Sequence, residues 1–201
     1  MNKAKVLVLV SGGGTNRKAM IDYINAGKAP HVDICRVIAS KPGVYALERA
    51  EKQGIPASVL ERKAFSDADS YCKALKSLID EDAPDLIVLA GFMCILTKEF
   101  TDSYPEKIIN VHPSLIPSFC GEGFYGLKVH EAALAYGVKV SGATVHYVNS
   151  VVDGGKIIAQ KAVDVLGNDT PDTLQKRIME NCEWIILPET VEKLAKEIVE
   201  K

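Results

Sequence analysis

The feature that most constrains the fold is a repeated alternation of short apolar runs with segments of helical spacing. Five runs rich in Val, Ile and Leu show no polar alternation, which is typical of strands covered on both faces. We predict these strands at 5–10, 31–39, 57–60, 85–90 and 107–111, with helices between them at 15–25, 44–53 and 67–82. This βαβα order predicts a parallel, doubly wound α/β sheet over roughly the first 112 residues.

The pattern changes after residue 112. A glycine-rich loop at 121–126 precedes a predicted helix at 129–136, and a turn at Asp153-Gly154-Gly155 joins predicted strands at 138–149 and 156–164. A final helix is predicted from 171 to the end, with a break at Pro188, since proline cannot donate a backbone hydrogen bond. No internal repeat or linker interrupts the sequence, so we expect a single domain over 1–201.

Composition narrows the class of protein. The formal net charge of −2 disfavours nucleic acid or an anionic membrane as the main partner, and no apolar stretch approaches the roughly 20 residues that span a bilayer. The apolar run that follows Lys5 is too short for a secretory signal and is interpreted as the first strand. The five cysteines include no C-x-x-C pair. We expect a cytoplasmic protein that acts on small molecules, as a monomer or homodimer.

The segment Ser11-Gly12-Gly13-Gly14-Thr15-Asn16 separates the first predicted strand from the first predicted helix. Glycines permit a tight turn, and the start of a helix presents free N–H groups at the positive end of its dipole. The segment matches neither G-x-G-x-x-G, because Arg17 replaces the third glycine, nor a Walker A loop. A phosphate-bearing ligand and a tight turn without a ligand both remain open.

Asn110 and His112 lie at the end of the fifth predicted strand, where Pro113 terminates it. Residues two apart on a strand share a face, and ligands of open α/β sheets bind beyond the carboxyl ends of the strands. An amide and a protonated imidazole could together stabilise the oxyanion of an acyl transfer, and the imidazole could also carry a proton. A structural hydrogen-bonding histidine is the alternative.

A carboxylate near His112 would raise its pKa and orient the ring. Asp153 is the candidate, although Asp-Gly-Gly is often only a turn between strands. We interpret His31 as a surface residue and His130 and His146 as structural or supporting residues. No pair of histidines has metal-ligand spacing with a carboxylate, so we expect no metal.

Five segments occur in an order that matches a known family. They are 11–16 (SGGGTN), 89–93 (LAGFM), 110–117 (NVHPSLIP), 142–146 (GATVH) and 152–155 (VDGG). Together they resemble the folate-dependent formyltransferases, and within that family the phosphoribosylglycinamide formyltransferases of purine synthesis.

The resemblance implies a Rossmann-like formyltransferase fold, with a mostly parallel sheet, antiparallel C-terminal strands and a long final helix. It implies transfer of the formyl group of 10-formyltetrahydrofolate, a co-substrate, to the amine of 5-phosphoribosylglycinamide. The product would be formylglycinamide ribonucleotide, an intermediate in IMP biosynthesis. No metal is implied.

Roles for individual residues follow from the same resemblance. Asn110, His112 and Asp153 correspond to the catalytic trio, in which the aspartate raises the pKa of the histidine. The acceptor phosphate would bind Gly14, Thr15 and Asn16, and Glu183 would bind the ribose hydroxyls. The folate would contact Met93, Cys94, Ile95, Leu96, Asn110, Val148 and Asn149. Residues 1–112 would form the phosphate-binding half and 113–201 the folate-binding and catalytic half.

The sequence departs from the family pattern at three places. Cys94 stands where many members carry Arg, and Ala68 stands near the position of an Arg that often holds the folate tail. Residues 120–124 form an insertion after Pro117, which could supply a replacement lid. We expect none of the three to touch the reacting groups.

Other functions compete with this one. Methionyl-tRNA formyltransferases and formyltetrahydrofolate deformylases share the catalytic motif but carry an additional domain, and the mild acidity disfavours tRNA. A sugar-nucleotide formyltransferase fits the phosphate loop less well. A nucleotide-binding module of Rossmann type would leave Asn110, His112 and Asp153 without a role.

Overall fold

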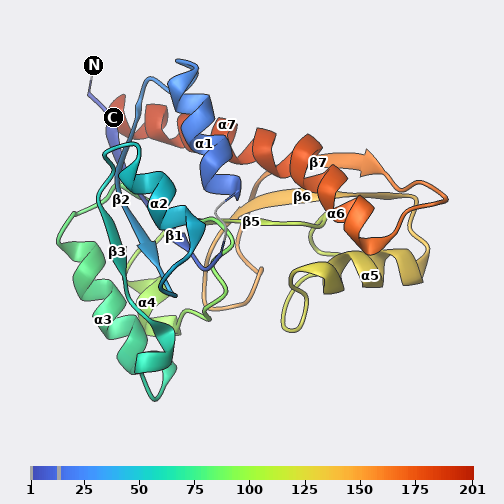
Figure 1. The fold of residues 1–201 in the computed structure, drawn as a ribbon, viewed down its shortest axis with the longest axis horizontal. Coiled ribbons are helices and arrows are strands. Elements are labelled where there is room, and N and C mark those ends of the chain that lie inside the picture. The colour runs from blue at the N-terminus through green and yellow to red at the C-terminus, as the bar shows by residue number, and fades with distance from the viewer. Residues whose placement is uncertain (1, 13–14) are drawn as a thin grey trace.

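One seven-stranded sheet organises the computed structural model, which describes residues 2–12 and 15–201. The strands lie in the order β3-β2-β1-β4-β5-β6-β7 (Figure 1). Their bounds are Ala4–Val10 (β1), Val32–Ala39 (β2), Ala57–Val59 (β3), Leu86–Leu89 (β4), Ile108–His112 (β5), Val140–Tyr147 (β6) and Ile157–Asp164 (β7). The chain order reverses between β1 and β4, so this is the topological switch point of the sheet.

Strand direction divides the sheet into two parts. β1 to β5 pair in parallel, whereas β6 pairs antiparallel with both β5 and β7. The predicted mixed sheet, with its parallel part first and its antiparallel strands last, is confirmed. β5 belongs to both parts, since β4 lies on one side of it and β6 on the other.

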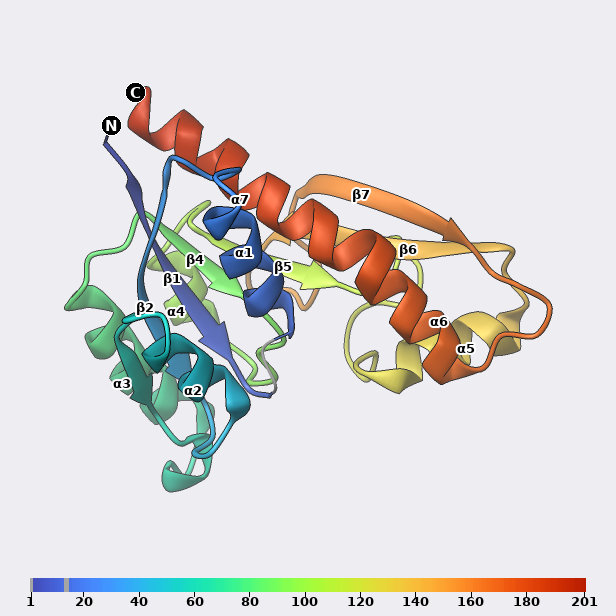
Figure 2. The same ribbon diagram turned by 45° about the horizontal axis from the view of Figure 1, so that its top comes forward.

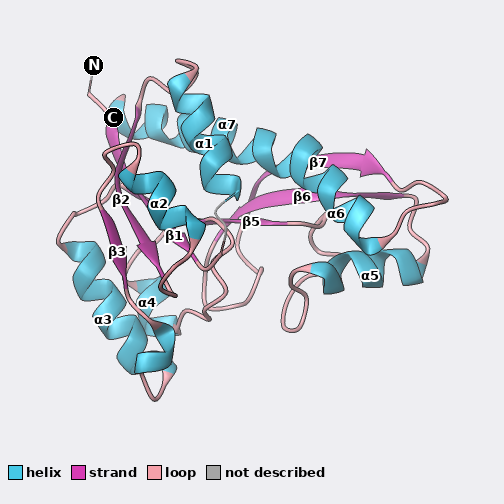
Figure 3. Ribbon diagram, viewed as in Figure 1, coloured by secondary structure: helices cyan, strands magenta, loops and turns pink. Residues whose placement is uncertain are grey.

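Helices cover both faces of the sheet (Figure 3). They are α1 (Thr15–Asn25), α2 (Tyr45–Glu51), α3 (Ala68–Asp80), α4 (Lys98–Asp102), α5 (Leu127–Tyr136), α6 (Pro171–Ile178) and α7 (Trp184–Val199). A π-helical segment, Met179–Glu183, joins α6 to α7. In the turned view of Figure 2, α7 runs along the sheet beside α1.

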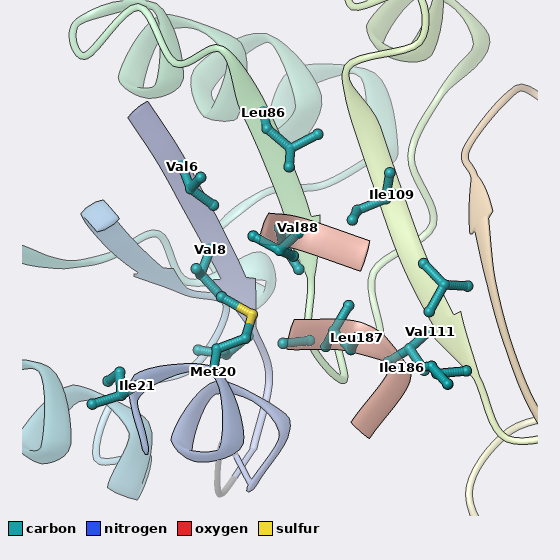
Figure 4. Close-up of a cluster of buried hydrophobic side chains, with 14 of the residues drawn as sticks. Val6, Val8, Met20, Ile21, Leu86, Val88, Ile109, Val111, Ile186 and Leu187 are labelled. Atoms are coloured by element: carbon teal, nitrogen blue, oxygen red, sulfur yellow. The ribbon is translucent and has the colours of Figure 1, made fainter. Parts of the chain in front are cut away.

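Alternation along the strands separates two apolar clusters, one on each face. Odd and even positions point to opposite faces, so Val6 and Val8 enter one cluster while Leu7 and Leu9 enter the other. The first cluster packs β1, β4 and β5 against α1 and α7 (Figure 4). The second packs the opposite face against α3 and α4. Strands buried on both faces explain the continuous apolar runs of the sequence.

The predicted elements are present, with ends shifted by up to two residues. The sequence analysis missed α4 and a 3-10 turn at Arg62–Ala64, both too short to show a helical period. The predicted break at Pro188 is wrong, because Pro188 lies inside α7. The irregularity lies upstream, in the π-helical segment. The carbonyl that Pro188 leaves without its usual donor belongs to Trp184, at the junction where the π turn meets α7.

No helix among the residues that the structure describes is long and apolar enough to cross a membrane.

The turn that carries Asp153 depends on the close approach of Gly155 to Tyr147. A Cβ at Gly155 would lie 1.7 Å from the Tyr147 carbonyl oxygen, which is backbone and cannot move aside. We therefore expect Gly155→Ala to lower the free energy of unfolding by about 1–3 kcal/mol, the usual cost of overpacking, measured by urea denaturation. Gly167→Ala is the matched control, because its Cβ would meet nothing within 4 Å. Equal stability of the two variants would contradict the expected clash.

Candidate active site

β5 and β6 bring the polar residues of the site together. Asn110 lies directly opposite His146 in the antiparallel register, and His112 lies opposite Thr144. Ile108, on the same face of β5, is a buried residue of the second apolar cluster. This face of the strand therefore changes from apolar at Ile108 to polar at Asn110 and His112, toward its carboxyl end. Asn110 and His112 share a face, as the sequence predicted.

Asp153 reaches the same place from the turn between β6 and β7. Gly154 N–H donates to the Val151 carbonyl at 3.0 Å and closes this turn. The Asp153 backbone is left-handed, with φ of 55°, a conformation that Asp tolerates better than most residues. Asp153 Oδ2 lies 3.5 Å from His112 Nδ1. The proximity of residues 112 and 153, which spacing alone left open, is confirmed.

His112 is buried and faces a hydrogen-bond acceptor on each ring nitrogen. Its Nε2 lies 2.9 Å from the carbonyl oxygen of Phe119. A carbonyl only accepts, so Nε2 carries a proton and donates. Its Nδ1 faces the Asp153 carboxylate. The doubly protonated ring therefore suits both partners.

Burial opposes that protonated form. Burial lowers the pKa of His112, the charge of Asp153 raises it, and the resulting pKa lies below the ordinary value for histidine. The predicted effect of Asp153 is right in sign, but desolvation outweighs it. For Asp153, burial raises the pKa, while hydrogen bonding to His146, the charge of His112 and the Gly121 amide bring it below the ordinary value.

His146, which the sequence suggested as a structural or supporting residue, lies beside the trio. Its Nδ1 lies 2.8 Å from the Tyr147 carbonyl oxygen and therefore donates. In the neutral ring, Nε2 then accepts from Asn110 Nδ2 at 3.2 Å. Only in the charged ring can the same Nε2, which lies 3.5 Å from Asp153 Oδ1, donate toward that carboxylate. Pairing of β5 with β6 places His146 beside Asn110, so a register assignment from sequence could have found it.

Segment 120–124, interpreted above as an insertion, reaches Asp153. Gly121 N–H donates to Asp153 Oδ2 at 2.9 Å, and the preceding Phe119 carbonyl accepts from His112. The expectation that this insertion stays clear of the site is wrong. Left-handed φ angles at Phe119 and Gly121 turn the loop so that its backbone faces both side chains.

The remaining histidines lie outside this network. His130 is fully buried, and neither of its ring nitrogens has a partner among the described residues. Burial and the nearby His112 lower the pKa of His130 to about 4, so it is neutral at physiological pH. His31 is only partly exposed and pairs with Glu192 at 2.6 Å, so it links the start of β2 to α7.

A second polar pair joins the start of α1 to the π-helical segment before α7. Asn16 Nδ2 donates to Glu183 Oε2 at 2.7 Å, and both residues are buried. Burial raises the pKa of Glu183, although the Asn16 bond opposes the shift. Asn16 Oδ1 is buried without a partner among the described atoms. Gly14 and the side chain of Thr15, also predicted for this site, lie outside what the structure describes.

The two segments predicted to bind folate lie together. Phe92, Cys94, Leu96 and Val148 pack on the second apolar cluster. Met93 and Ile95, which alternate with them, are exposed by 54% and 67%. Asn149 is exposed, and its Oδ1 accepts from Val151 N–H. These segments thus present apolar side chains to solvent beside the polar network.

Among the described residues, no group of three or more His, Cys, Asp or Glu side chains is arranged to hold a metal ion.

Comparison with known proteins agrees with this geometry. The model of the formyl transferase family matches residues 4–191. The chain belongs to the formyl transferase family.

Two relatives and one solved structure illustrate the similarity. A trifunctional purine biosynthetic protein adenosine-3 of Gallus gallus is 42% identical over 181 residues, which are 89% of this chain and 17% of that protein. A phosphoribosylglycinamide formyltransferase of Haemophilus influenzae is 40% identical over 92% of this chain and 84% of that protein. The crystal structure of glycinamide ribonucleotide transformylase 1 from Symbiobacterium toebii has a TM-score of 0.89 and 36% identity, covering 97% of this chain and 89% of that one.

The chain therefore spans 17% of the length of the Gallus gallus trifunctional protein. It spans most of the length of the Haemophilus influenzae protein.

The effect of Asp153 on His112 predicts how the pKa of His112 changes when Asp153 is replaced. Asp153 raises the pKa of His112, so Asp153→Asn should lower that pKa further. Histidine is charged below its pKa, so the variant should need a lower pH to protonate the ring. NMR titration of ¹⁵N-histidine-labelled protein measures this directly. Asp172→Asn, at an exposed position in α6, is the control. An unchanged or higher pKa of His112 in Asp153→Asn would rule out the direct effect of the carboxylate.

Proposed function

We propose that this formyl transferase moves the formyl group of 10-formyltetrahydrofolate to the amine of 5-phosphoribosylglycinamide. The observation that carries the proposal is the polar network in which His112 and His146 share the carboxylate of Asp153, beside Asn110. The 40% identity to the Haemophilus influenzae phosphoribosylglycinamide formyltransferase, over most of both chains, supports this choice of acceptor.

In this proposal the chemistry is an acyl transfer. The amine of the acceptor forms a bond to the formyl carbon, negative charge develops on the formyl oxygen, and the bond from the formyl carbon to the folate nitrogen then breaks. One proton must leave the amine, and one must reach the departing nitrogen. Asn110 and protonated His112 would donate to the formyl oxygen as its charge develops, and His112 would relay the proton. His112 would use its Nε2–H for both, so this N–H would have to leave the Phe119 carbonyl when the substrates bind.

The surroundings of His112 suit a group that gains and loses a proton. Acceptors at both ring nitrogens favour the charged ring, whereas burial favours the neutral ring. These opposing effects keep the two forms closer in free energy than either effect alone would allow. A proton carrier works best under that condition. Asp153 would hold the charged form in place and would remain ionised, consistent with its lowered pKa.

The acceptor would bind at the start of α1. We propose that its phosphate contacts the backbone of Gly14, Thr15 and Asn16, at the positive end of the helix dipole. Glu183 would bind the ribose hydroxyls from the π-helical segment. The unpartnered Asn16 Oδ1 supports the ribose part of this arrangement, because a buried acceptor without a partner is costly unless a donor such as a ribose hydroxyl satisfies it.

The folate would bind along the two apolar segments described above, with contacts to Met93, Cys94, Ile95, Leu96, Asn110, Val148 and Asn149. The exposed apolar side chains of Met93 and Ile95 support this proposal. Residues 1–201 would then act as one catalytic domain, built around a single seven-stranded sheet. We further propose a cytoplasmic location, which five free thiols favour.

The test of the function combines wild type and Asp153→Asn. With both substrates, wild-type protein should release tetrahydrofolate, followed by its absorbance, and formylate the acceptor. Asp153→Asn should lower kcat by at least about a hundredfold, the scale of general acid–base catalysis, with KM values near wild type. Asp172→Asn should behave as wild type. Absence of turnover in the wild type would overturn the function, and normal turnover in Asp153→Asn would overturn the role of the aspartate.

Asn16→Ala tests the acceptor site separately. The variant removes the hydrogen bond to buried Glu183 and the proposed ligand contact. Loss of a hydrogen bond that involves a charged group predicts a rise in acceptor KM of about tenfold, with little change in folate KM. Steady-state kinetics with each substrate varied in turn measures both values. An unchanged acceptor KM would exclude a role for the Asn16 side chain in acceptor binding.

A further inference from the structure

Three strand ends meet at the topological switch point of the sheet. Ser11 follows β1, Ser40 follows β2, and Gly91 lies just beyond β4. Ser11 and Ser40 are almost completely buried, with exposed fractions of 5% and 1%. Ser11 also begins the glycine-rich segment that precedes α1. Ser11 is not among the residues proposed to bind either substrate.

Ser11 holds the segment after β4 with both its backbone and its side chain. Its N–H donates to the Gly91 carbonyl at 3.2 Å, and its Oγ accepts from Met93 N–H at 2.9 Å. Gly91 has φ of 72°, a left-handed turn that favours glycine and redirects the chain back toward Ser11. Ser40 Oγ lies 2.6 Å from Ser11 Oγ on the opposite side. The Ser11 hydroxyl is thus bonded on two sides at once.

The bond to Met93 fixes which side chains of the following segment face outward. Phe92, Cys94 and Leu96 pack on the second apolar cluster, whereas Met93 and Ile95 are exposed. A rotation of the backbone at Met93 would exchange these two sets. Leu89, the last residue of β4, is in register with Asn110 of β5. The segment therefore begins beside the reacting groups.

We infer that Ser11 is a positioning residue that sets residues 93–96 for folate binding and ties them to the phosphate loop. The inference rests on the proposed function for its choice of ligand. Ser11 touches no reacting group. It acts through Met93 N–H, which presents the exposed Met93 and Ile95 side chains toward the folate.

The test compares Ser11→Ala with Ser40→Ala. Both variants delete a buried serine hydroxyl and break the Ser11–Ser40 hydrogen bond, but only Ser11→Ala removes the acceptor of Met93 N–H. We expect Ser11→Ala to raise the KM for 10-formyltetrahydrofolate about fivefold, the effect of one neutral hydrogen bond, with kcat near wild type. Ser40→Ala should leave that KM within about twofold of wild type. Ser11→Cys, which keeps the packing but offers a weak acceptor, should also raise it.

Amide hydrogen exchange gives a readout that is independent of activity. The Met93 amide should exchange about fivefold faster in Ser11→Ala than in Ser40→Ala, because only the first variant leaves it without a partner. Equal folate KM and equal Met93 exchange in the two variants would overturn the inference. If wild-type protein shows no formyl transfer but Met93 exchange responds as expected, the proposed function fails while the positioning contact stands.

Discussion

The site depends on the double pairing of β5. This strand is parallel to β4 and antiparallel to β6. Parallel pairing brings Leu89 beside Asn110 and delivers the segment after β4 to the carboxyl end of the sheet. Antiparallel pairing brings His146 opposite Asn110 and leads the chain into the turn that carries Asp153. A shift of the β6 register by one residue would turn His146 to the opposite face.

The carboxylate of Asp153 has three partners from distant parts of the chain. His112, His146 and the Gly121 amide all approach it. A buried carboxylate without partners would carry a large desolvation cost, and its pKa would rise. Here the partners outweigh burial, and the pKa falls. The charge therefore persists inside the protein, where its effect on His112 is less screened than at the surface.

The sequence predicted the sheet and its helices because strands buried on both faces leave an unmistakable apolar pattern. It also predicted that Asn110 and His112 share a face, since that follows from strand periodicity alone. It did not reveal which residues His146 contacts, because those contacts depend on the β5–β6 register. The contact of Gly121 with Asp153 was missed for a similar reason: a backbone amide in a loop has no signature in side-chain chemistry.

The direction of the pKa shift at His112 could not be predicted from the sequence either. A nearby carboxylate predicts a raised pKa, but the extent of burial is a property of the folded chain. At Pro188 a local rule predicted a helix break, but the helix continues through this residue and the irregularity lies upstream, at Met179–Glu183.

The bond between Asn16 and Glu183 joins residues 167 positions apart in the sequence. On a ribosome, Asn16 emerges before β2 to β7 have been made, whereas Glu183 emerges only after the last strand, β7, which ends at Asp164. Because Glu183 reaches its buried position through the segment that leads into α7, packing of that last long helix completes the pair. On the proposed function, a nascent or truncated chain lacking this segment could fold its parallel strands and still be unable to hold the acceptor. Catalysis would then begin only after synthesis has passed Glu183 and α7 has packed.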